Sequence, residues 1–175
     1  MIANFSQRKV LKSLRTKLIT QFGAALAVIL PPLLFPEATT AQSATICGIG
    51  APSGFVAVAY QYSSNCRRSS SSTSFAPNAT VIATPFSGQT ICGIGAPSGF
   101  VAVAYQYSSN CRRSSSSTSF APNATVIATP SSGQTKCGIG APPGFIAVRY
   151  TYNSNCRLSS SSTSFAPNAT VIRSF

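Results

Sequence analysis

Residues 91–111 read ICGIGAPSGFVAVAYQYSSNC, and closely similar stretches precede and follow them at a fixed distance. The first cysteine of each copy recurs every 45 residues, and so does the second. Residues 46–90 and 91–135 differ at one position only, and residues 136–175 match 91–130 at 30 of 40 positions. A fixed period of this length indicates one small folded unit that is copied along the chain.

The middle of each copy predicts a β-strand, because residues 100–107 are rich in Val, Phe and Tyr. In the third copy Ala104 is replaced by Arg149, while the odd-numbered positions of the strand stay apolar or aromatic. Side chains alternate across a strand, so the odd-numbered face is expected to be buried and the even-numbered face to be wet. The expected inward residues are Val101, Val103, Tyr105 and Tyr107.

The rest of the unit predicts turns and a second short strand. Residues 92–99 are rich in Gly and Pro, which is typical of tight turns. Residues 112–119 form either an exposed loop or a second, edge strand, and their Ser-rich composition favours the loop. Residues 125–127 favour a short strand that pairs with the long one. The prediction is an all-β fold of small antiparallel units with two or three strands each, and helix is expected only near the N-terminus.

The predicted organisation of the chain is a signal peptide at 1–41, repeats at 46–82, 91–127 and 136–175, and linkers at 83–90 and 128–135. Two arrangements of the repeats remain open. They form separate beads on short linkers, or they stack into a short rod. A closed propeller is disfavoured, because three units do not complete a ring.

The N-terminus has the pattern of a secretory signal peptide. Five basic residues precede an apolar run at 22–35, and small residues follow at 38–44. Cleavage is expected after Ala41, with Ser43 as the alternative. An uncleaved membrane anchor is less favoured, since the run is shorter than the roughly 20 residues that a span needs. The expected location is the periplasm, the cell surface or the extracellular space.

The cysteines predict one disulfide in each repeat. Paired cysteines in an exported chain indicate disulfides, and the repeat favours closure of each unit on itself. Such a bond stabilises a unit that is too small to fold on its apolar core alone. Zinc is disfavoured, because the chain has no C-x-x-C and no His. The predicted pairs are Cys47–Cys66, Cys92–Cys111 and Cys137–Cys156.

The composition argues against an enzyme. The sequence has no His, and its single acidic residue, Glu37, lies in the predicted signal peptide. General acid–base pairs, serine triads and paired glycosidase carboxylates all need side chains that the exported part lacks. No catalytic residue, cofactor or metal is therefore predicted.

The exported part is strongly basic, which favours an anionic partner. Its arginines suit phosphate, sulfate and carboxylate groups, and repetition adds avidity toward a polyanion. The candidate binding residues are Arg67, Arg68, Arg112, Arg113, Arg149 and Arg157. An anionic polysaccharide or another envelope component is the expected partner, and export makes nucleic acid a poor fit. Membrane contact is expected only through an uncleaved signal segment. A cationic membrane-active effector and a passive structural spacer are the alternatives.

The Cys-Gly-Ile-Gly-Ala-Pro-x-Gly-Phe run with its distant second cysteine resembles short repeats in exported bacterial proteins, of a kind frequent in cyanobacteria. That group has no established activity, so the resemblance implies export and a disulfide-closed unit. Each repeat also carries an Asn-Ala-Thr glycosylation pattern, which begins at Asn78, Asn123 and Asn168.

Overall fold

The computed structural model describes residues 42–67, 75–114, 119–159 and 164–175. Several predicted features lie outside these ranges: the signal peptide at 1–41, its expected helix, its first predicted cleavage position after Ala41, and Arg68. Among the described residues, the helical elements are three single 3-10 turns, each of which ends on the second cysteine of its repeat. These turns are η1 (Ser64–Cys66), η2 (Ser109–Cys111) and η3 (Ser154–Cys156).

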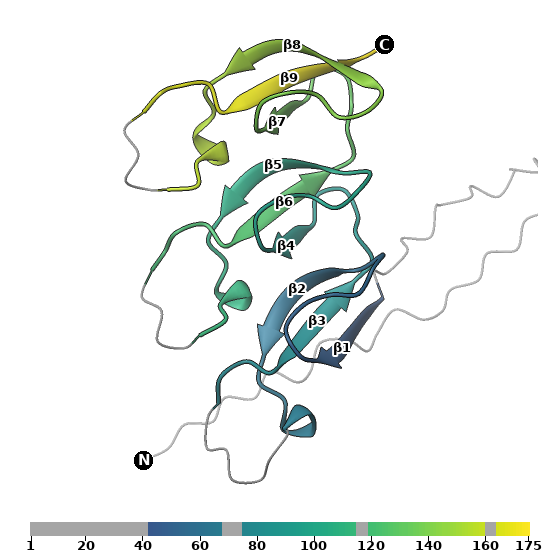
Figure 1. Ribbon diagram of the computed structural model, residues 1–175, viewed down its shortest axis with the longest axis vertical. Coiled ribbons are helices and arrows are strands. Elements are labelled where there is room, and N and C mark those ends of the chain that lie inside the picture. Colours follow the sequence, from purple (N-terminus) through teal and green to yellow (C-terminus); the bar gives the residue numbers. More distant parts are fainter. Residues whose placement is uncertain (1–41, 68–74, 115–118, 160–163) are drawn as a thin grey trace, which may run out of the picture. The chain divides into compact units, whose positions relative to one another are not determined.

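Each repeat forms one three-stranded antiparallel sheet, so the predicted all-β fold is confirmed (Figure 1). The strand that comes last in the sequence of each repeat lies in the middle of its sheet, with orders β1-β3-β2, β4-β6-β5 and β7-β9-β8. The strands of the first repeat are β1 (Ser43–Cys47), β2 (Val56–Gln61) and β3 (Ala79–Ala83). Those of the second are β4 (Thr90–Cys92), β5 (Val101–Gln106) and β6 (Ala124–Ala128). Those of the third are β7 (Thr135–Cys137), β8 (Phe145–Thr151) and β9 (Ala169–Ser174).

The three predicted disulfides are confirmed, with Cα–Cα distances of 5.1, 5.0 and 5.1 Å. Each disulfide joins the end of the first strand of a repeat to the 3-10 turn that follows the long strand. The disulfide therefore links the first strand to the end of the long strand. Within the sheet, these two outer strands are joined only through their hydrogen bonds to the middle strand.

A fully buried threonine of the middle strand organises the turn after the first cysteine. The Oγ1 of Thr125 donates to the carbonyl oxygen of Gly93 at 2.7 Å and accepts from the amide of Gly95 at 3.1 Å. Thr80 makes the same two bonds in the first repeat, and Thr170 donates to Gly138 in the third. Gly93 and Gly95 both have positive φ, a conformation that favours glycine. The hydroxyl thus serves as the hydrogen-bond partner of two backbone groups in this sharp turn.

Replacing Thr125 with valine is expected to lower the free energy of unfolding by about 1–3 kcal/mol, because two partly buried backbone groups lose their partner. Valine keeps the shape of the side chain, so the effect isolates the hydroxyl. Thr129→Val at an exposed position is the matched control and should change the stability by less than about 0.5 kcal/mol. Equal midpoints for both variants in chemical unfolding would contradict this role of Thr125.

The burial predicted for the long strand is wrong in part, for two reasons. A β-bulge between Ala102 and Ala104 interrupts the alternation, and Ala102, predicted to be wet, is buried. The second reason is that the cover comes from the next repeat. In the third repeat, where the structure describes no such cover, three of the four equivalents of the predicted inward residues are exposed, with Val148 at 54% and Tyr150 at 51%.

The predicted linkers are shorter than the sequence suggests. Ala83 ends β3 and Thr90 begins β4, so both ends of the 83–90 segment belong to strands. Within the segment, the amide of Gly88 donates to the carbonyl of Ile127 at 2.8 Å, and the carbonyl of Gln89 accepts from the amide of Ile127 at 2.9 Å. Gly133 and Gln134 make the same bonds with Ile172. Each connection is therefore held on the middle strand of the repeat that follows it.

Successive repeats pack against one another through apolar side chains, which favours stacked repeats over separate beads. Strand β2 lies beside β4 and η2, and β5 lies beside β7 and η3. We call these contacts the first and second junctions. The first junction contains a cluster of Val56, Val58, Ile91, Phe100 and Ile127. The second contains Ala102, Tyr105, Cys137, Cys156 and Ala169. The core is thus shared between neighbouring repeats.

Candidate functional site

The first arginine of each predicted pair has a fixed backbone position. Arg67, Arg112 and Arg157 directly follow the disulfide cysteine and cap the 3-10 turn, and each amide donates to the carbonyl of the serine three residues earlier at 3.3 Å. Arg112 and Arg157 are half-buried and Arg67 is exposed. The turn and the disulfide thus hold the backbone of one arginine at the same point of each unit.

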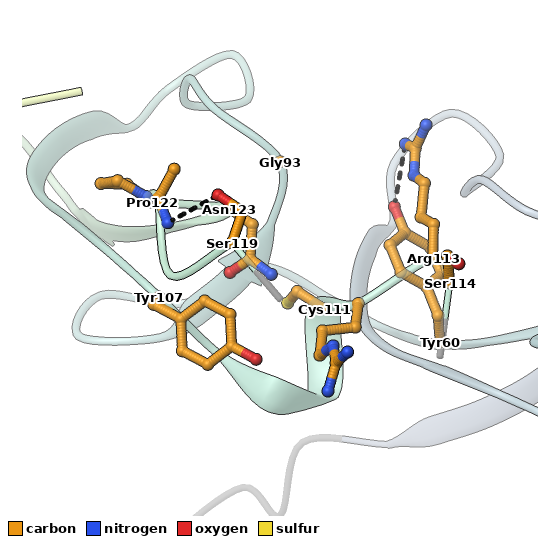
Figure 2. Close-up of a pocket in the computed structure, with 11 residues that line it drawn as sticks. Tyr60, Gly93, Tyr107, Cys111, Arg113, Ser114, Ser119, Pro122 and Asn123 are labelled. Atoms are coloured by element: carbon orange, nitrogen blue, oxygen red, sulfur yellow. Dashed lines mark hydrogen bonds between the residues drawn. The ribbon is translucent and has the colours of Figure 1, made fainter. Parts of the chain in front are cut away.

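The second repeat holds a pocket of about 390 Å³ beside this point (Figure 2). Both Arg112 and Arg113 line it, and Tyr60 reaches it from the first repeat. Figure 2 shows Asn123 and the ring of Tyr107 on one side of the view, and Arg113 with Tyr60 on the other. The other lining residues are Gly93, Cys111, Ser114, Ser119, Ala121 and Pro122. The pocket therefore combines two cations with hydroxyl and amide groups.

Arg113 connects the pocket to the first junction. One of its terminal nitrogens donates to the hydroxyl of Tyr60 at 3.2 Å, and its guanidinium carbon lies 5.2 Å from the centre of the same ring. The contact crosses 53 residues of sequence and holds an exposed arginine over a buried tyrosine. A cation placed over an aromatic ring contributes about 0.5–1 kcal/mol at an exposed site. Arg113 thus both lines the pocket and contacts the previous repeat.

Asn123 is ordered by two bonds to one residue. Its Oδ1 accepts from the amide of Ser108 at 2.7 Å, and its Nδ2 donates to the carbonyl of Ser108 at 3.0 Å. Asn78 and Asn168 repeat the arrangement with Ser63 and Asn153. The Asn-Ala-Thr pattern therefore has a structural role, because its asparagine fixes the turn after the long strand and its threonine fixes the turn after the first cysteine.

An exposed phenylalanine borders the pocket. Phe120 is 77% exposed, and its ring meets that of Tyr107 edge-on with centroids 5.2 Å apart. The pairs Tyr62–Phe75 and Tyr152–Phe165 have the same geometry. Edge-to-face packing of this kind is favourable. Each unit therefore presents an exposed phenylalanine ring that a tyrosine of the same unit holds in place.

The second junction has different chemistry at the equivalent positions. Leu158 replaces Arg113, and Lys136 replaces the buried Ile91. Lys136 lines a second cavity of about 310 Å³ together with Tyr105. Burial lowers the pKa of Lys136 and raises the pKa of Tyr105. Both shifts favour the neutral forms, as desolvation does where no counter-charge is present.

The structure brings together only part of the predicted binding set. Arg112 and Arg113 share one pocket, and Arg157 occupies the position of Arg112 in the third repeat. Arg149 lies exposed on β8, and Arg67 follows η1. Sequence reasoning missed Tyr60, Tyr107 and Asn123 as pocket residues. The recurrence of Asn123 in every copy was the available signal, but it was interpreted as a glycosylation pattern.

Comparison with family models, with curated proteins and with solved structures gives no match for this chain. In the described part of the chain, no helix has the length and apolar character that crossing a membrane requires. The features of the molecule that bear on its function are therefore the disulfides, the charge and the pocket. The three disulfides indicate an oxidising environment, of the extracellular or periplasmic kind.

Proposed function

We propose that this is a non-enzymatic, exported repeat protein of the bacterial envelope or outer surface that binds an anionic polysaccharide. The observation that carries the proposal is the pocket in which Arg112 and Arg113 face hydroxyl and amide groups. Guanidinium groups bind sulfate and carboxylate through paired hydrogen bonds, and hydroxyls and amides supply the neutral contacts that a sugar needs.

The charge balance supports an anionic ligand. Residues 42–175 carry no acidic side chain, so no carboxylate side chain competes for the arginines. Of the 13 basic residues in the chain, five lie in the first 17 positions and the other eight lie beyond residue 66. A surface of one sign raises the local concentration of polyanion and speeds its association.

Repetition strengthens the proposal, because the disulfide and the 3-10 turn place Arg67, Arg112 and Arg157 equivalently. A polymer that reaches two such arginines binds more tightly than one that reaches a single arginine, provided that their spacing is fixed. The packed junctions supply that fixed spacing. The arrangement suits a long, repetitive anion better than a small one.

Arg112→Gln is expected to weaken binding of a sulfated polysaccharide such as heparin by about tenfold or more, because a charged hydrogen bond contributes roughly 1.5–3 kcal/mol. The measurement is a titration at about 50 mM and about 500 mM NaCl, since screening should weaken the binding further. Dextran, which is neutral, should not bind at either salt concentration.

Arg173→Gln is the matched control, because Arg173 is exposed and lies outside the pocket. Its expected effect on affinity is less than about threefold. An equal loss of affinity in both variants would mean that net charge alone drives the binding, and it would contradict a pocket site. Affinity that neither salt nor substitution changes would exclude the proposal and favour a passive spacer, and leakage of anionic vesicles would favour a membrane-active effector.

A further inference from the structure

The same kind of interface occurs twice inside the chain. At both junctions the long strand of one repeat packs against the first strand and the 3-10 turn of the next. At the first junction, Val56 of β2 is buried with Ile91 of β4 and Ile127 of β6. At the second, the Cys137–Cys156 disulfide is buried on the side of β5 that carries Ala102. Every repeat therefore has one surface that accepts the next repeat and one that fits the previous repeat.

The last repeat leaves its accepting surface open. Ile146, Val148 and Tyr150 of β8 are the equivalents of Val101, Val103 and Tyr105, and all three are exposed. We call these three residues the tail face. The strand keeps its apolar character although these three side chains are exposed in the structure, and exposed apolar patches of this kind mark interaction sites.

The first repeat leaves the complementary surface open within the described residues. Cys47 is exposed, whereas Cys137, its equivalent in the third repeat, is buried by the repeat before it. Ile46 is half-buried, whereas its equivalent Ile91 is buried at the first junction. We call Ile46 and Cys47 the head face.

We infer that the exported protein associates head to tail with further copies of itself, the tail face of one copy covering the head face of the next. The contact continues the internal interface, since the head face carries Ile46, the equivalent of Ile91 at the first junction, and the tail face carries the matching apolar strand. Because the two faces differ, the contact is heterologous and extends into open chains of copies instead of closing as a dimer.

Two features make this contact weaker than the internal junctions. Each copy carries excess positive charge, so copies repel one another at low salt. Arg149 also stands on β8 where the earlier repeats have Ala59 and Ala104. A charged residue on an outer strand restrains association. The inferred assembly is therefore reversible and strengthens as ionic strength rises.

Sedimentation velocity of the exported protein in buffer without polyanion tests the inference. The weight-average mass should rise above that of the monomer with protein concentration, and more steeply at high salt. Val148→Arg should weaken the association at least about tenfold, because a charge would enter an apolar contact. Arg149→Ala, which restores the residue of the other repeats, should strengthen it. Monomers at every concentration for both the natural chain and Arg149→Ala would overturn the inference.

Leu158→Arg is the matched control. Leu158 and Val148 are both 54% exposed in the third repeat, both changes add one positive charge, and the other two repeats already carry arginine at the position of Leu158. This variant should keep the association within about threefold of the natural chain. If Leu158→Arg weakened the association as much as Val148→Arg does, the added charge alone would explain both effects. That result would contradict the role of the tail face.

A mixing experiment tests the direction of the contact. Val148→Arg leaves the head face intact, and Ile46→Asp leaves the tail face intact, so each variant alone should stay monomeric. An equimolar mixture should form a pair containing one copy of each and stop there. A mixture that stays monomeric, or pairs formed by one variant alone, would overturn a head-to-tail contact.

Discussion

Ile127→Ala should lower the free energy of unfolding by about 2–5 kcal/mol, the usual effect of truncating a fully buried aliphatic side chain. Ile127 is fully buried in the cluster that joins the first two repeats, where Val56 belongs to one repeat and Ile91 to the other. Its backbone also carries the two hydrogen bonds that hold the connecting segment. The loss should therefore loosen both repeats, which hydrogen exchange of the β3 and β6 amides can follow.

Ile94→Ala is the control for this prediction, because Ile94 is 49% exposed in the same repeat. Its expected effect is below about 0.5 kcal/mol. Faster exchange in β6 with unchanged exchange in β3 would contradict a core shared between the repeats.

Removing one disulfide by paired Cys→Ala substitution should lower the stability by about 3 kcal/mol, since each bond closes a loop of 19 residues in sequence separation. The equal loop lengths allow a sharper comparison. Cys137 and Cys156 are buried at the second junction, whereas Cys47 is exposed. Loss of the Cys137–Cys156 bond should therefore destabilise by roughly 1 kcal/mol more than loss of Cys47–Cys66, because it also leaves a cavity.

Urea unfolding of the two double variants measures this difference. Equal destabilisation would mean that the disulfides act only by restricting the unfolded chain, and that the sulfurs of the third repeat contribute nothing to the packing between repeats. A larger loss for Cys47–Cys66 would contradict the burial of the second junction.

The repeat, the disulfides and the all-β class could be predicted from the sequence, because they follow from spacing and composition. The long strand at 100–107 was located correctly for the same reason. Its faces were not, because alternation assumes a regular strand and one buried side. The bulge at Ala102–Ala104 and the cover from the next repeat break both assumptions.

The first strand of each repeat was missed for a physical reason. Thr90–Cys92 is only three residues long, too short to show a period, and the Gly-rich turn that follows hides it. The role of Thr125 was hidden as well, since a threonine in a strand normally indicates only β-propensity. Its partners, Gly93 and Gly95, lie 32 and 30 residues away in the sequence.

Of the candidate site, the sequence could predict the charged residues. Arg112 and Arg113 were identified because they follow a cysteine in a part of the chain without acidic side chains, and both line the pocket. Tyr60 belongs to another repeat, so only the packing of repeats could place it beside Arg113. The proposed avidity depends on that packing, because arginines on independently moving beads would not keep a fixed spacing.

Differential scanning calorimetry of residues 42–175 tests the shared core most directly. The repeats are nearly identical, so separate beads would also unfold within one narrow temperature range, and a single peak does not distinguish the two cases. The ratio of the van't Hoff to the calorimetric enthalpy does. Repeats that share a core should unfold as one cooperative unit with a ratio near one, whereas a ratio of about one third would mean three independent units and would contradict the shared core.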